Sequence, residues 1–384
     1  MARLAVIEKL GRLQEDARMR IETATLYHVS LQLKKPFVTG FGTIASRDIL
    51  LVKVCSNGLA GWGEGPHLPA PIYLPEFLAG GKDLLSRHIL PMIVGQELAS
   101  PEQVCQCYSH FKGNCISKAA VETAVWDLFA IAQSKCLWKY LGATRNTSQL
   151  GASIGIVGEE NVLAGIAAVQ AAGYRRVKLK IKPGQDLQIV KLVRSCYPDL
   201  PLMVDCNSSY SLKDVDIFKA LDSFGLLMIE QPFAYDDLID HAKLQKQIDT
   251  PICLDESIRS AEDARKAVEL GSCRVINIKP SRVGGIAESL KILSVCQEHG
   301  LSAWIGGQLE SAVGKAMLGH MACLDGINMP VEVTPPSDYL TEDLAKLQPP
   351  VDGILSAGES PGIGIEIDHD ILDRCTCSKV VIEP

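Results

Sequence analysis

Short apolar runs in the middle of the chain each end on a charged residue, and these residues recur about every 25 positions. In chain order they are Lys180, Asp205, Glu230, Asp255 and Lys279. Each run is short and rich in Val, Ile or Leu, which is typical of a buried β-strand. A strand-plus-helix unit of a parallel barrel needs on the order of 25 to 30 residues. The pattern therefore predicts a parallel (β/α) barrel whose charged residues stand at the strand ends, where such barrels keep their active sites.

The segments between these runs have helical spacing of apolar residues, which favours the barrel over an open sheet. The expected helices span residues 161–172, 187–196, 211–222, 236–247, 260–270 and 286–298. A further strand is expected at residues 302–305, and the pattern fades after about residue 330. We assign residues 141–334 to the barrel domain.

The N-terminal third of the chain has a different pattern. Residues 24–31, 49–54 and 60–64 alternate between apolar and polar positions, and Asn57-Gly58 suits a hairpin turn between the last two. Residues 75–140 then read as helices, with the strongest at 117–132. These features predict an α+β domain over residues 22–140, with residues 335–384 packing back on it and residues 1–21 as an N-terminal extension.

Composition narrows the class of protein. The 384 residues carry a net charge of −7 and include 47% hydrophobic residues. An acidic chain argues against nucleic-acid binding, which needs a basic surface. No apolar run approaches the ~20 residues that span a membrane, and Met1–Arg20 lacks the apolar core of a signal peptide. We expect a cytoplasmic protein.

The 13 cysteines are expected to be free thiols in a reducing compartment. The closest pairs, Cys105/Cys107 and Cys375/Cys377, lack the two-residue spacing of a zinc knuckle, so we expect both to be structural.

The three carboxylates at consecutive strand ends predict a metal site. Closing a barrel would bring Asp205, Glu230 and Asp255 together, and three unneutralised carboxylates could not all stay ionised. An all-oxygen ligand set suits Mg²⁺, with Mn²⁺ as an alternative. Lysines 178, 180 and 279 flank the three carboxylates. A bound metal could hold a substrate carboxylate while one lysine, its pKa lowered by neighbouring cations, removes the proton α to it.

Two loops are candidates for the mouth of the site. Residues 36–43 form a glycine-rich segment that includes Gly40 and Phe41. This segment suits either an ordinary turn or a mobile lid that closes on a ligand. Residues 65–71, rich in proline, suit the mouth equally well.

Five motifs together resemble the enolase superfamily, muconate-lactonizing subgroup, and most of all its o-succinylbenzoate synthase/N-succinylamino acid racemase family. The motifs are Lys-Leu-Lys at 178–180, Val-Asp-Cys-Asn at 204–207, Ile-Glu-Gln-Pro at 229–232, Leu-Asp-Glu-Ser at 254–257 and Asn-Ile-Lys-Pro at 277–280. The resemblance covers residues 22–384 and implies a (β/α)₇β barrel with an α+β capping domain formed from both chain ends.

The resemblance also implies roles for individual residues. Mg²⁺ ligands would be Asp205, Glu230 and Asp255; Lys180 would be the general base, Lys279 the lysine on the opposite face, and Lys178 would lower the pKa of Lys180. Substrate-contacting positions would be Ser153, Lys178, Asn207, Gly307 and Gln308, and the specificity loop would hold Gly40 and Phe41. Relatives usually carry methionine in place of Gln308, and residues 334–336 are unexpectedly proline-rich, so the substrate is less well defined than the chemistry.

The resulting hypothesis is an Mg²⁺-dependent lyase, o-succinylbenzoate synthase, acting on a small-molecule carboxylate in menaquinone biosynthesis. N-succinylamino acid racemase is the main alternative, and muconate cycloisomerase remains open. Dipeptide epimerase is less favoured because residues 328–334 lack paired aspartates. A non-catalytic metal-binding relative would have lost a ligand or lysine, and none is lost here. The family resemblance suggests a homo-oligomer.

Overall fold

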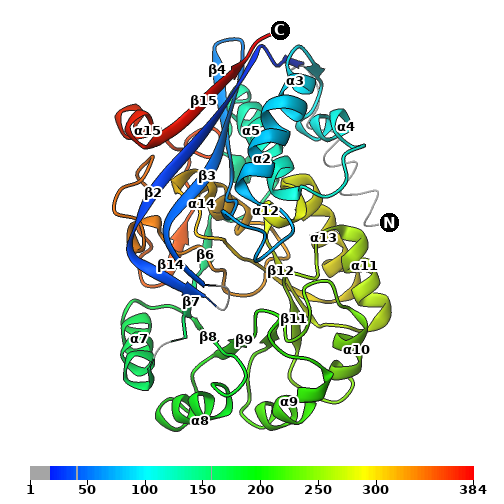
Figure 1. Cartoon of the computed structure of the whole chain (residues 1–384), viewed down its shortest axis with the longest axis vertical. Coiled ribbons are helices and arrows are strands. Elements are labelled where there is room, and N and C mark those ends of the chain that lie inside the picture. The colour runs from blue at the N-terminus through cyan, green and yellow to red at the C-terminus, as the bar shows by residue number, and fades with distance from the viewer. Residues whose placement is uncertain (1–17, 40–41, 157) are drawn as a thin grey trace.

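The computed structural model describes residues 18–39, 42–156 and 158–384. Most of the expected N-terminal extension and the proposed lid residues Gly40 and Phe41 lie outside the described residues. In Figure 1, long N-terminal strands and the helices beside them lie above a ring of alternating strands and helices. No described helix has both the length and the apolar character that a membrane crossing requires.

The N-terminal sheet joins an early and a late segment of the chain, and Figure 1 shows the C-terminal strand β15 beside β2. Its antiparallel order is β15-β2-β3-β4. These strands span Thr376–Ile382, Thr23–Thr39, Gly42–Ser56 and Leu59–Gly65. Asn57 and Gly58 connect β3 to β4 with φ of 50° and 75°, the positive values that a two-residue hairpin turn requires. A separate pair joins β1 (Met19–Arg20) to β5 (Glu97–Leu98).

One long helix, α5 (Cys115–Ala132), packs across this sheet and contributes many buried residues to its core. A Cβ placed on Gly61 or Gly63 of β4 would lie 2.2 or 2.1 Å from a backbone oxygen of α5, so only glycine allows this approach. The other elements here are short: α2 (Leu78–Leu84), η1 (Leu85–Ile89), α3 (Leu90–Ile93), η2 (Pro101–Gln103), α4 (Val104–Cys107) and α6 (Leu137–Tyr140).

Seven parallel strands follow one another in chain order, from β7 to β13. They span Gly151–Ile154, Arg176–Lys180, Leu202–Asp205, Ile229–Glu230, Ile252–Leu254, Val275–Ile278 and Ser302–Ile305. The intervening helices are α7 (Glu159–Ala171), α8 (Leu187–Cys196), η3 and α9 (Leu212–Asp214, Val215–Asp222), α10 (Ile239–Gln245), α11 (Ala261–Leu270), α12 (Pro280–Val283) and α13 (Ile286–His299). The predicted strand–helix alternation is confirmed.

An extended segment, residues 328–332, closes the gap between the first and last of these strands. The Gly151 amide donates to the Val331 carbonyl at 2.8 Å, and the Glu332 amide donates to the Ile305 carbonyl at 2.9 Å. This segment takes the place of an eighth strand, as in the predicted (β/α)₇β barrel with a capping domain, and that fold is confirmed. The domain boundaries drawn from the sequence stay a prediction.

Helix α14 (Ala312–Met321) was not predicted, because all of its residues are buried and it therefore has no polar face. The remaining elements are β6 (Thr147–Gln149), which pairs with β14 (Ile354–Ser356), η4 (Pro336–Asp338) and α15 (His369–Cys375). Inside the barrel a separate cluster of Met203, Met228, Cys253, Val275 and Trp304 fills the space beneath the strand ends.

Candidate active site

The predicted carboxylates stand at the C-terminal ends of three neighbouring strands. Asp205 ends β9, Glu230 ends β10, and Asp255 directly follows β11. The ladder register aligns Lys180, Asp205 and Glu230 in one row. The three acidic residues are at most 1% exposed. Charges buried this deeply require partners, and the neighbouring strands supply them.

Lys178 is the cation at the centre of the site. Its Nζ lies 3.2 Å from Asp205 Oδ2, 3.2 Å from Glu230 Oε2 and 2.6 Å from Glu332 Oε2. Burial alone would lower the pKa of Lys178, but the carboxylates of Glu230, Glu332 and Asp205 raise it above its ordinary value. Lys178 is therefore a fixed positive charge, and it shares an oxygen of Asp205 with Lys180.

Lys180 is the more accessible of the two lysines of β8. Its side chain is 17% exposed, against 5% for Lys178. Lys180 Nζ lies 3.1 Å from Asp205 Oδ2 and also donates to Asn207 Oδ1. Asn207 in turn donates through Nδ2 to Glu256 Oε1 at 3.2 Å. Strand β8 thus buries Lys178 among carboxylates and leaves the side chain of Lys180 partly exposed.

Lys279 lies on the other flank of the carboxylates, after β12. Its Nζ contacts Asp255 Oδ2 at 2.8 Å and donates to the hydroxyl of Tyr73 at 2.9 Å. The Tyr73 hydroxyl donates to the same Asp255 oxygen at 3.1 Å. Burial lowers the pKa of Lys279, but Tyr73, Glu230 and Glu256 together raise it above its ordinary value. Because Tyr73 belongs to the capping domain, both domains contribute to this flank.

Two of the three carboxylates, Asp255 and Glu230, also have a fixed partner from the barrel wall. Arg282 donates to Asp255 Oδ1 and, at 2.6 Å, to the carbonyl of Asn277. The Asn277 side chain donates to Glu230 Oε1 at 2.7 Å. The orientations of Asp255 and Glu230 are therefore set by residues that do not face a substrate.

The donor set fits a hard divalent cation. Asp205, Glu230 and Asp255 offer only carboxylate oxygens, which Mg²⁺ prefers. Glu256, next to Asp255, has a buried Oε2 without a hydrogen-bond partner among the described residues. Burial and the charge of Asp205 raise the pKa of Glu256 to about 7. An unpartnered buried carboxylate oxygen beside three further carboxyl groups is the feature that a bound cation would satisfy.

Three of the predicted substrate-contacting residues, Ser153, Gly307 and Gln308, lie in the first or just after the last of the seven parallel strands. Ser153 is exposed on β7 and pairs with Lys178 in the ladder. Gly307 follows β13, and a Cβ at this position would meet Lys315 Nζ at 2.4 Å. The backbone amide of Gln308 donates to Glu310 Oε1 at 2.7 Å. The side-chain Nε2 of Gln308 is buried without a hydrogen-bond partner in the described structure.

Sequence reasoning missed several residues that the fold brings into the site. Glu256 and Arg282 lie within or beside the motifs, so their proximity could have been a signal. Tyr73 and Glu332 lie in irregular segments without periodicity, and only the closed barrel and its cap bring them to the lysines.

This fold and this site define the class of protein. Residues 21–142 match the family described as "Mandelate racemase / muconate lactonizing enzyme, N-terminal domain", and residues 162–371 match "Enolase C-terminal domain-like". The chain belongs to the enolase superfamily, in its muconate-lactonizing subgroup, and is an enzyme.

Individual proteins of this superfamily are similar to the chain over most of its length. The chain is 42% identical over 358 residues to the o-succinylbenzoate synthase of Bacillus subtilis, covering 93% of this chain and 96% of that protein. It is 43% identical over 360 residues to the N-succinylamino acid racemase of Thermus thermophilus, covering 93% and 98%. A crystal structure of an enolase-superfamily member from Listeria innocua superimposes with a TM-score of 0.91 at 38% identity, covering 95% and 99%.

Proposed function

We propose that the protein is an o-succinylbenzoate synthase, which dehydrates 2-succinyl-6-hydroxy-2,4-cyclohexadiene-1-carboxylate. The observation that carries the proposal is the placement of Lys180 and Lys279 on the two flanks of the carboxylate strands. The similarity to the Bacillus subtilis synthase over nearly the whole chain supports it.

Asp205, Glu230 and Asp255 would hold the Mg²⁺ ion, or Mn²⁺ as an alternative. When bound, the ion supplies a Lewis acid that takes the substrate carboxylate and stabilises negative charge on it. Lys178 stays buried beside Asp205 and Glu230 and shares the Oδ2 atom of Asp205 with Lys180.

The reaction then needs one proton taken and one returned. Lys180 removes the proton from the ring carbon that bears the carboxylate, and the electron pair spreads into that carboxylate. The pair then forms a double bond to the adjacent ring carbon as the C–O bond to the hydroxyl breaks. Lys180 gives its proton to the departing hydroxide, so water and the aromatic product result. Lys279, paired with Asp255, remains a cation that stabilises the intermediate.

A second candidate activity is racemisation of N-succinylamino acids. It is favoured by the Thermus thermophilus relative, which is 43% identical to this chain, against 42% for the Bacillus subtilis synthase. In this reaction Lys180 and Lys279 would face opposite sides of the α-carbon, one removing a proton and the other donating one. Muconate cycloisomerase and dipeptide epimerase remain more distant alternatives, and a homo-oligomeric assembly stays a prediction.

The test is a panel of purified protein with Mg²⁺, assayed on the cyclohexadiene carboxylate and on N-succinyl amino acids. Turnover of the first substrate with release of o-succinylbenzoate supports the proposal. Racemisation without dehydration would assign the second activity instead. Undiminished turnover after EDTA treatment and desalting would contradict the metal assignment.

A further inference from the structure

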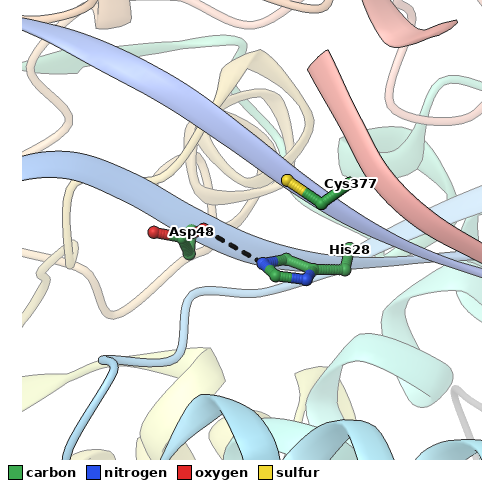
Figure 2. Close-up of side chains that lie close together, drawn as sticks. All are labelled: His28, Asp48 and Cys377. Carbon is green, nitrogen blue, oxygen red and sulfur yellow. Dashed lines mark hydrogen bonds and ion pairs between the residues drawn. The ribbon is translucent and has the colours of Figure 1, made fainter.

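Three potential metal ligands meet in the N-terminal sheet, outside the site described above. His28 on β2, Asp48 on β3 and Cys377 on β15 each present one ligand atom, and these atoms lie within 4.8 Å of one another (Figure 2). Among the described residues, this is the one group of His, Cys, Asp and Glu side chains with that property. Its members come from three adjacent strands and from both ends of the chain.

The backbone brings the three side chains to one face. His28 Nε2 lies 3.0 Å from Asp48 Oδ1, which faces it diagonally across the β2–β3 ladder. On the other side of β2 the ladder shifts register between Thr376 and Ser378. A β-bulge places two residues opposite one, so Cys377 and Ser378 both face His28. If the register of residues 378–382 continued regularly, Cys377 would pair with Val29 and point to the face opposite His28.

The dimensions suit a small ion. A tetrahedral zinc ion with bonds of about 2.0–2.3 Å holds its ligand atoms roughly 3.3–3.8 Å apart. The His28–Asp48 pair is already near this separation. The sulfur lies no more than 4.8 Å from either atom, so it needs to approach by at most about 1 Å, which rotation of an exposed cysteine supplies. The side chains of His28 and Asp48 are 19% and 25% exposed, so an ion can enter without opening the fold.

The donor chemistry selects the metal. Thiolate and imidazole ligands favour Zn²⁺ over Mg²⁺, which prefers oxygen alone. A thiolate from Cys377, a carboxylate from Asp48 and a neutral His28 give two negative charges, which balance a divalent ion. Ser46 Oγ donates to the second oxygen of Asp48 at 3.4 Å and orients that carboxylate. The fourth position is left to water.

We propose that His28, Asp48 and Cys377 form a Zn²⁺ site that fastens the C-terminal strand β15 to strands β2 and β3. This site is separate from the Mg²⁺ site of the proposed function and supplies stability to the capping domain. Cys375 and Cys377 thus differ: Cys375 contacts Glu342 and has no part in the site.

The test uses the full-length protein, stripped of metal with EDTA, desalted, and saturated with Mg²⁺ to occupy the oxygen ligands of the barrel. Co²⁺ is then titrated in, because a thiolate–cobalt charge-transfer band reports sulfur ligation that carboxylates cannot give. Cys377→Ser removes the sulfur ligand, and Cys375→Ser, a cysteine two positions away, is the matched control. His28→Ala tests the nitrogen ligand.

The wild type and Cys375→Ser are expected to develop the band with one equivalent of Co²⁺ and to lose it when Zn²⁺ is added. Cys377→Ser is expected to lack the band, and His28→Ala to bind at least about 100-fold more weakly, more than loss of an outer ligand contact costs. Zn²⁺ should raise the Tm of the wild type and leave that of Cys377→Ser unchanged. No band in the wild type, or an undiminished band in Cys377→Ser, would overturn the proposal whatever the enzymatic activity.

Discussion

Replacing Lys178 with methionine tests whether this lysine, more than Lys180, holds the barrel mouth together. Methionine keeps much of the apolar stem and removes the charge. The change leaves Asp205, Glu230 and Glu332 without the amine that lies 3.2, 3.2 and 2.6 Å from them. Lys180→Met is the matched control, because Lys180 lies on the same strand and also contacts Asp205.

The expected magnitudes differ because burial and partner number differ. Removing one member of a buried ion pair costs about 3–5 kcal/mol, since the remaining charge stays uncompensated. Lys178 is 5% exposed and has three carboxylate partners, so its loss should reach that range. Lys180 is 17% exposed with one carboxylate partner, so its loss should cost about 1–2 kcal/mol.

Urea unfolding in EDTA at neutral pH measures this difference. The raised pKa of Lys178 means that its stabilisation is fully present below the unfolded pKa of about 10.4 and is lost only as the pH rises toward the folded value. Neutral pH therefore samples the whole contribution. Equal free energies of unfolding for the two variants, or a Lys178→Met protein as stable as the wild type, would refute the reasoning.

Three further predictions concern Glu122, His67 and Tyr73. Glu122 accepts hydrogen bonds from Trp126 Nε1 and from the first two amides of α13, so Glu122→Ala should lower the free energy of unfolding by about 3 kcal/mol. Glu298 is an exposed residue of α13, and Glu298→Ala should change the free energy of unfolding by less than about 0.5 kcal/mol. Equal effects of the two substitutions would disprove the role of Glu122 in capping α13.

Burial lowers the pKa of His67 to about 4, so protonation of this residue alone should remove about 3 kcal/mol of stability as the pH falls from about 6.5 to 4. His67→Gln should lack this part of the pH dependence, and an unchanged slope would contradict it. Tyr73→Phe removes the hydroxyl between Lys279 and Asp255 and should lower kcat/KM about tenfold to hundredfold, whereas unchanged kinetics would exclude that hydroxyl from the mechanism.

The barrel and the charged residues at its strand ends could be predicted because they recur at a nearly constant spacing in the sequence. Each unit contributes one apolar strand and one charged residue at its end, so Lys180, Asp205, Glu230 and Asp255 are visible as a period in the sequence. The same register appears in the ladder pairs of the structure. Such a spacing can be recognised in the sequence alone, without knowledge of the fold.

The parts that escaped prediction depend on contacts between distant segments. Glu332 closes the barrel in a segment without strand periodicity, and Tyr73 reaches Lys279 from another domain. Helix α14 is buried on all sides, so no polar face marks it. Cys377 was expected to be structural, and only the β-bulge that turns it toward His28 suggests otherwise.

The most direct test of the proposed mechanism is removal of the base at Lys180 without removal of its charge. Lys180→Arg keeps a cation beside Asp205 but cannot accept a proton near neutral pH. With Mg²⁺ present, both Lys180→Arg and Lys180→Ala should lose at least about 10²-fold in the rate of dehydration while retaining the fold. A Lys180→Arg enzyme that dehydrates the cyclohexadiene carboxylate at the wild-type rate would contradict the assignment of Lys180 as the base.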